Sequence, residues 1–180
     1  MIAIIGKTCV GKTFLLDKAH ELGYSTLNCD LFFAKEYQFG NKCYELIKKN
    51  LGKEYVNSAT VDKKMLKEFI STQKNKDLLE KLIFPVLFEH FEKYNYDFVE
   101  IPILYSKIVN FERFFNKTLN ITASMETRRK ILKFKNVDNY DFEFFDSINT
   151  GFSKPQNVDI NMDNIHKNID WKVFFQRYYV

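Results

Sequence analysis

One short motif near the N-terminus restricts the possible folds of this chain more than any other feature. Residues 6–13 spell Gly-Lys-Thr-Cys-Val-Gly-Lys-Thr, which is a glycine, four variable residues, a second glycine, a lysine and a threonine. An apolar run at residues 1–5 precedes the motif, and apolar residues recur at helical spacing after it. A buried strand, this loop and a helix, in that order, are the context in which the motif binds phosphate. A chance glycine turn is the alternative interpretation.

The residue types of the loop suit the phosphate chain of a nucleotide. Gly6 and Gly11 let the backbone turn and approach phosphate oxygens closely. Lys12 would bring its charge to the β- and γ-phosphates, and Thr13 would give a hydroxyl to Mg²⁺. The other loop residues that we expect to bind the nucleotide are Lys7, Thr8, Cys9 and Val10.

Two other classes of phosphate-loop protein fit the sequence less well. A GTPase needs an Asn-Lys-x-Asp motif for guanine, and the segment Asn41-Lys42-Cys43-Tyr44 lacks the aspartate. A large ATPase needs a longer sheet and usually a strand that ends in Asp-Glu. A small kinase is the class that remains.

Hydrophobic patterning predicts a single α/β domain. The chain is 46% hydrophobic, which is enough to form a sizeable core. A strand, a helix and a second strand fit within residues 1–28, and such a unit implies a parallel sheet. Strands are expected at residues 1–5, 24–28, 98–104, 119–123 and 158–160.

Capping residues and helix breakers set the expected helix boundaries. Gly23 is expected to end the helix after the loop, and Ser124 to cap a helix at residues 125–134. Pro85 interrupts the apolar stripe of residues 75–94, which predicts two helices with Pro85 in the first turn of the second. Further helical structure is expected over most of 31–71 and at 140–147 and 169–179.

Charge and cysteine content narrow the expected partners and location. The net charge of +4 is interspersed along the chain, without the basic stripe that nucleic-acid binding needs. The three cysteines have no metal-ligand spacing, and free thiols suit a reducing compartment. No apolar run is long enough to cross a bilayer, and no signal peptide is recognisable. We expect a cytoplasmic protein, monomeric or weakly oligomeric, without nucleic-acid or membrane partners.

From residue 1 to about 164, the sequence resembles the dephospho-CoA kinase family. That family has a Leu-Gly turn and then a strand ending in an Asp-Ala-Asp-like motif, here Leu22-Gly23 and Asn28-Cys29-Asp30. The departures from its pattern are Asn28 for an aspartate, Phe84 for a histidine and Ser106 for an acid. The shorter matches are Ala34-Lys35, Val61-Asp62-Lys63, Leu82-Ile83-Phe84-Pro85-Val86, Ile101-Pro102-Ile103-Leu104-Tyr105-Ser106 and Val158-Asp159-Ile160-Asn161.

The resemblance implies both a fold and an activity. The fold is a three-layer P-loop NTPase of the nucleoside-monophosphate-kinase-like type, with a five-stranded parallel sheet. A single domain over residues 1–180 would carry a helical acceptor-binding region at about 31–95 and a lid at about 124–150. The activity is the transfer of the γ-phosphate of ATP, with Mg²⁺, to the ribose 3′-hydroxyl of dephospho-CoA, a small-molecule substrate.

The resemblance also assigns roles to individual residues. Asp30 follows a strand beside the loop strand, at the sheet edge where ligands bind, and would accept the hydroxyl proton; capping of the next helix is the alternative. Lys12 and Arg129 would neutralise the migrating phosphoryl group, in a lid register of Glu126, Arg129 and Lys133 that is uncertain by one residue. The remaining expected ligands are Arg128 and Asn161 for the nucleotide, Asp30, Lys35, Asp62, Lys63, Pro85 and Pro102 for the acceptor, and Thr13 and, through water, Glu100 for the metal.

Two other functions stay open at this point. A kinase for another small molecule, a nucleoside or a nucleotide would use the same loop and lid. A nucleotide-binding module that has lost catalysis would explain the three departures from the family pattern. Ordinary structural roles also remain open for single residues, because Asp62 could be a helix cap and the lid arginines a solvated face.

Overall fold

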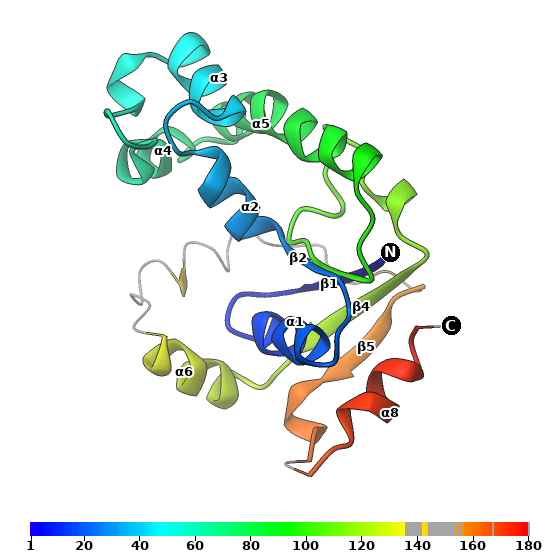
Figure 1. Cartoon of the computed structure of the whole chain (residues 1–180). Coiled ribbons are helices and arrows are strands. Elements are labelled where there is room, and N and C mark those ends of the chain that lie inside the picture. Colours follow the sequence, from blue (N-terminus) through cyan, green and yellow to red (C-terminus); the bar gives the residue numbers. More distant parts are fainter. Residues whose placement is uncertain (136–141, 144–153, 155, 167, 180) are drawn as a thin grey trace. The chain divides into compact units, whose positions relative to one another are not determined.

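A five-stranded parallel sheet forms the centre of the fold. The computed structural model describes residues 1–135, 142–143, 154, 156–166 and 168–179 (Figure 1). The strand order is β2-β3-β1-β4-β5, with every pair parallel, so the predicted α/β class and five-stranded parallel sheet are confirmed. The expectation that the strand before Asp30 lies beside the loop strand is wrong, because β3 lies between β2 and β1. The strands are β1 (Ile2–Gly6), β2 (Thr26–Asn28), β3 (Phe98–Glu100), β4 (Lys117–Thr122) and β5 (Val158–Asn161).

The third strand is shorter than expected. β3 ends at Glu100, whereas the apolar pattern predicted a strand over residues 98–104. Pro102 lies in a turn after it, as suits a residue that cannot donate a hydrogen bond to a sheet. The end of β3 therefore places Glu100 at the carboxyl edge of the sheet.

Two helix boundaries lie at the capping residues that the sequence predicted. Ser124 accepts a hydrogen bond from the Thr127 N–H at the start of its helix, and Gly23 adopts a φ of +88° just after the first helix. The helix expected at 140–147 falls largely outside the described residues. The helices are α1 (Lys12–Glu21), α2 (Cys29–Glu36), α3 (Lys42–Asn50), α4 (Lys63–Phe69), α5 (Gln73–Lys93), α6 (Met125–Phe134) and α8 (Trp171–Gln176), with short 3-10 turns η1 (Lys53–Tyr55), η2 (Glu112–Phe114) and η3 (Met162–Asn164). Among the described helices, none is long and apolar enough to span a membrane.

The predicted break at Pro85 is wrong, because α5 runs without interruption through this residue. A proline in a helix interior costs about 3 kcal/mol, since it removes a hydrogen bond and crowds the preceding turn. Fully burying one large apolar side chain contributes about 1.5–3 kcal/mol. Ile83, Leu87 and Phe91 are among the buried residues of this helix. Together they outweigh the cost of the proline.

The chain divides into two compact units. The sheet unit comprises Met1–Cys29, Tyr96–Tyr105 and Glu112–Val180, and the helical unit comprises Asp30–Asn95 and Ser106–Phe111. The helical unit takes in the region that the sequence assigned to the acceptor, about 31–95. The expectation of one domain over residues 1–180 stays a prediction.

The core of the sheet unit combines β1 with aliphatic and aromatic side chains from the helices. All five residues of β1 are buried, as expected for a strand that is covered on both faces. From α8, Phe175 packs against Phe98 of β3 with ring centroids 5.0 Å apart. The aromatic C-terminal segment therefore packs against the sheet, next to α1 (Figure 1).

The helical unit has an aromatic core of its own. Phe84 is buried and packs against Phe111, with ring centroids 5.8 Å apart, and against Phe33 at 6.3 Å. A phenylalanine at the position where the resemblance expects a histidine thus fills space in the core of this unit.

Gly6 provides a test of the turn from β1 into the loop. Its φ is +140°, and a Cβ there would lie 2.3 Å from the backbone oxygen of Ile121. We predict that Gly6→Ala lowers the free energy of unfolding by more than about 2 kcal/mol, since backbone strain and a steric clash add. Gly23→Ala is the matched control, because Gly23 also has a positive φ but has nothing within 4 Å of an added Cβ. Equal losses for the two variants in chemical denaturation would contradict the prediction.

Candidate active site

The loop after β1 has the conformation of an anion-binding concavity. Gly6, Cys9 and Gly11 have φ values of 140°, 59° and 99°. Left-handed residues in a tight turn are how successive backbone N–H groups come to line such a concavity. The loop leads directly into α1, whose N-terminus adds a favourable electrostatic field for phosphate.

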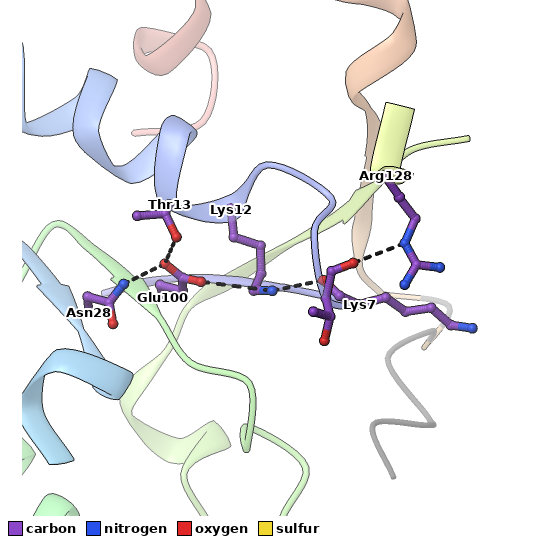
Figure 2. Close-up of polar contacts among 7 residues, drawn as sticks. Lys7, Lys12, Thr13, Asn28, Glu100 and Arg128 are labelled. Atoms are coloured by element: carbon purple, nitrogen blue, oxygen red, sulfur yellow. Dashed lines mark hydrogen bonds and ion pairs between the residues drawn. The ribbon is translucent and has the colours of Figure 1, made fainter. Parts of the chain in front are cut away.

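Lys12 lies across this loop. Its ammonium donates a hydrogen bond to the Lys7 carbonyl at 2.9 Å and lies 3.8 Å from Oε1 of Glu100 (Figure 2). Both neighbours hold the positive charge close to the loop. This is the position from which a lysine can reach the β- and γ-phosphates.

Glu100 is a buried carboxylate that connects three segments of the sheet unit. In the register of the sheet it lies opposite Ile4 of β1 and Asn28 of β2, and it is only 3% exposed. Its Oε2 accepts hydrogen bonds from the Asn28 amide at 2.7 Å and from the Thr13 hydroxyl at 3.1 Å (Figure 2). A buried carboxylate is tolerated only when it is paired and hydrogen-bonded. The protein itself therefore supplies the partners, and a contact of Glu100 with Mg²⁺ through water stays a prediction.

The contact with Glu100 determines what the Thr13 hydroxyl can bind. The hydroxyl has one proton and two lone pairs, and the proton is donated to Glu100. Its oxygen can therefore still offer lone pairs to a cation. Mg²⁺ is usually bound by one or two protein oxygens together with phosphate oxygens and water, so the donor set at the start of α1 fits this ion.

Of the two neighbouring arginines of α6, Arg128 is the one that reaches the loop. Its Nε donates to the Thr8 carbonyl at 3.0 Å, and its guanidinium lies 4.8 Å from the centre of the Phe142 ring. Arg128 is 4% exposed, whereas Arg129 lies on the exposed side of α6. The geometry therefore favours Arg128 as the residue in contact with the loop, and the catalytic role expected for Arg129 stays a prediction.

Asp163 anchors the start of α6 and was not expected from the sequence. Its carboxylate accepts hydrogen bonds from the Ser124 N–H at 2.6 Å and from the hydroxyls of Ser124 and Thr127. The hydrogen bond from Thr127, followed by that from the Ser124 backbone, lowers the pKa of Asp163. The preceding residue, Met162, lies against Gly11, where an added Cβ would come within 3.3 Å of its side chain. The segment after β5 thus contacts both the loop and the start of α6.

Asn161 has a structural partner in this segment. Its side-chain oxygen accepts from the Asp163 N–H at 2.9 Å and so caps η3. An asparagine followed two residues later by an aspartate is a local signal that could have revealed this cap. The contact of Asn161 with the nucleotide stays a prediction.

Most of the expected acceptor residues belong to the helical unit. Asp30 is exposed and lies inside the first turn of α2, not at its N-cap. Asp62 caps α4 by accepting from the N–H groups of Lys64 and Met65, while Ser106 accepts from two N–H groups of the following turn. The helical unit is described separately from the loop, so the acceptor roles stay predictions. They concern Asp30, Lys35, Asp62, Lys63 and Pro85, and also Pro102 of the sheet unit.

Comparison with known proteins identifies the family. The sequence profile of the family described as Dephospho-CoA kinase matches residues 1–149 of this chain. The chain belongs to the dephospho-CoA kinase family. Membership in this family makes the chain an ATP-dependent kinase, as the sequence predicted.

Relatives agree with this placement, and a solved structure has a similar fold. The chain is 27% identical over 146 residues to a dephospho-CoA kinase of Mycoplasma pneumoniae, covering 77% of this chain and 73% of the relative. A dephospho-CoA kinase of Mycoplasma genitalium is 41% identical over 86 residues, or 46% of this chain and 41% of the relative. The fold is similar to that of the protein TT1252 from Thermus thermophilus, with a TM-score of 0.75, 22% identity and coverage of 98% and 94% of the two chains.

The two arginines of α6 should have separable effects. We predict that Arg128→Ala lowers the free energy of unfolding by about 1–3 kcal/mol, because the Thr8 carbonyl loses a charged donor. It should also weaken ATP binding in calorimetry, since the loop loses a support. Arg129→Ala should leave stability and ATP affinity unchanged and lower kcat by about 10²–10³, as loss of one transition-state donor does. An unchanged kcat for Arg129→Ala would remove Arg129 from the catalytic residues.

The anchor at Asp163 should depend on pH. Because its pKa is lower in the folded chain than in the unfolded chain, its stabilisation is complete above the unfolded value of about 3.9. It is lost as the pH falls through the folded value. We predict that the unfolding midpoint of Asp163→Asn in urea lies below that of the parent protein at pH 7 and approaches it towards pH 3. A difference that stays constant across this range would contradict the prediction.

Proposed function

We propose that the chain transfers the γ-phosphoryl group of ATP to the ribose 3′-hydroxyl of dephospho-CoA, giving CoA. Family membership over residues 1–149 supports the reaction. The observation that carries the proposal is the arrangement of Lys12, Thr13 and Glu100 at the mouth of the phosphate loop. Phosphoryl transfer depends mainly on positioning and on neutralising charge. Lys12 suits the neutralisation of charge, and Thr13 and Glu100 suit the positioning of groups around the loop.

The residues of the loop would divide the work between binding and charge neutralisation. The backbone of the loop and the N-terminus of α1 would hold the β-phosphate. Lys12 would turn from the Lys7 carbonyl to the phosphate oxygens and neutralise the migrating group. Thr13 would hold Mg²⁺, which neutralises charge on the β- and γ-phosphates when it is bound.

Asp30 is the favoured acceptor of the hydroxyl proton. Glu100 is less suited, because it is buried and accepts hydrogen bonds from Asn28 and Thr13. Asp30 is exposed. It follows Asn28 by two residues, which limits the distance between their Cα atoms to about 7 Å. Chain connectivity alone thus keeps this carboxylate close to the end of β2.

The helical unit would supply the acceptor site, with Lys35 and Lys63 available for anionic groups of dephospho-CoA. Lys35 and Lys63 are both exposed. We also infer a cytoplasmic location, which the free thiols of Cys9, Cys29 and Cys43 support. A nucleoside or nucleotide kinase is the competing function, because its loop and lid would serve equally well.

An assay across acceptors tests the proposal. The purified chain, with ATP and Mg²⁺, should convert dephospho-CoA to CoA and ADP, and should leave a nucleoside and a nucleoside monophosphate unchanged. Asp30→Ala should keep its ATP affinity in calorimetry and lose about 10²–10⁴ in kcat, the usual contribution of a general base.

Three results would overturn parts of this scheme. Turnover of a nucleoside without turnover of dephospho-CoA would show a different kinase. Tight ATP binding without turnover of any acceptor would show a nucleotide-binding module. An unchanged kcat for Asp30→Ala would show that Asp30 is not the base.

A further inference from the structure

One oxygen atom of Glu100 links the end of β2 to the start of α1. Asn28 and Glu100 are the last residues of neighbouring parallel strands and lie opposite each other in the register of the sheet. Oε2 of Glu100 accepts both from the Asn28 amide at 2.7 Å and from the Thr13 hydroxyl at 3.1 Å (Figure 2). Thr13 directly follows the lysine of the loop. Residue 28 is therefore connected to Thr13, at the end of the loop, through the carboxylate of Glu100.

Asn28 can hold Glu100 because its side chain has an amide group that donates hydrogen bonds. An ionised carboxylate only accepts hydrogen bonds, whereas an amide can donate. Asn28 can therefore donate to Oε2 of Glu100, while Oε1 of the same carboxylate lies 3.8 Å from the Lys12 ammonium. A carboxylate at position 28 has no amide proton to donate in this way.

The sheet itself does not need this side chain. The pairing of β2 with β3 comes from the backbone and extends from Thr26 to Asn28. Losing the amide would leave that ladder in place and would remove one of the two donors seen on Glu100 Oε2. The carboxylate would then lose its contact with the end of β2 and would be less firmly oriented towards the Thr13 hydroxyl.

We propose that Asn28 is a positioning residue for phosphoryl transfer, acting through Glu100 on the Thr13 hydroxyl. Asn28 fixes the carboxylate, the carboxylate holds the hydroxyl proton, and the Thr13 oxygen then presents its lone pairs to the cation that accompanies the nucleotide. This inference rests on the proposed function, since it concerns the same phosphate site. It gives a role to Asn28, which otherwise is only a departure from the aspartate of the family pattern.

The proposal makes a selective claim about affinity. Backbone N–H groups and Lys12 contact phosphate whether or not a cation is present. The Thr13 lone pairs depend directly on the Asn28–Glu100 contact, whereas Lys12 is also held by the Lys7 carbonyl. Substitution of Asn28 should therefore weaken the contribution of Mg²⁺ to ATP binding and leave the cation-independent contribution intact.

Calorimetry with and without Mg²⁺ tests this claim. Asn28→Ala should reduce the factor by which Mg²⁺ tightens ATP binding by about tenfold, the lower end of the cost of losing an outer-shell partner of a metal ligand. Its Kd for ATP in EDTA should stay within about twofold of the parent value, and its kcat should fall while the KM for the acceptor is unchanged. Thr26→Ala is the matched control, because it alters the same strand two residues away.

The outcomes separate this proposal from the proposed function. If Asn28→Ala and Thr26→Ala weaken ATP binding equally with and without Mg²⁺, Asn28 is only structural and the inference fails. If the parent protein does not phosphorylate dephospho-CoA but Asn28→Ala still loses the Mg²⁺-dependent affinity, the inference stands and the acceptor assignment fails.

Discussion

The candidate site depends on one carboxylate that is buried inside the sheet unit. Glu100 is almost completely buried, and a charge in that position is costly unless polar groups surround it. Its partners come from β2, from the start of α1 and from the lysine of the loop. Satisfying this charge therefore fixes the end of two strands and the first residues of the helix relative to one another. The conformation of the phosphate loop therefore depends on the partners of Glu100 as well as on the glycines of the loop.

A second set of contacts holds the other side of the loop. Arg128 reaches the Thr8 carbonyl from α6, and Asp163 fixes the start of that helix. Met162 lies against Gly11. The loop is thus supported by residues that are more than a hundred positions away in the sequence, and its conformation is a property of the whole sheet unit.

Local patterns made the loop, the caps and the parallel sheet predictable from the sequence. A glycine, a lysine and a threonine at fixed spacing after an apolar run, or a serine before an amphipathic helix, specify structure within a few residues. The continuity of α5 through Pro85 depends on the burial of its apolar face, which no local rule contains. The contacts of Asn28 with Glu100 and of Asp163 with α6 depend on which strands become neighbours. The motif match noted Asn28 only as a departure and did not reveal its partner.

The resting contacts of Lys12 have a consequence for the catalytic cycle. Its ammonium already has a carbonyl partner and a nearby carboxylate, so a phosphate that arrives replaces one partner with another. Such an exchange releases less free energy than capture by a solitary cation, because a hydrogen bond is broken for each one formed. The same carbonyl can receive the lysine again when ADP departs. A smaller gain in free energy at Lys12 would favour the release of ADP over its retention.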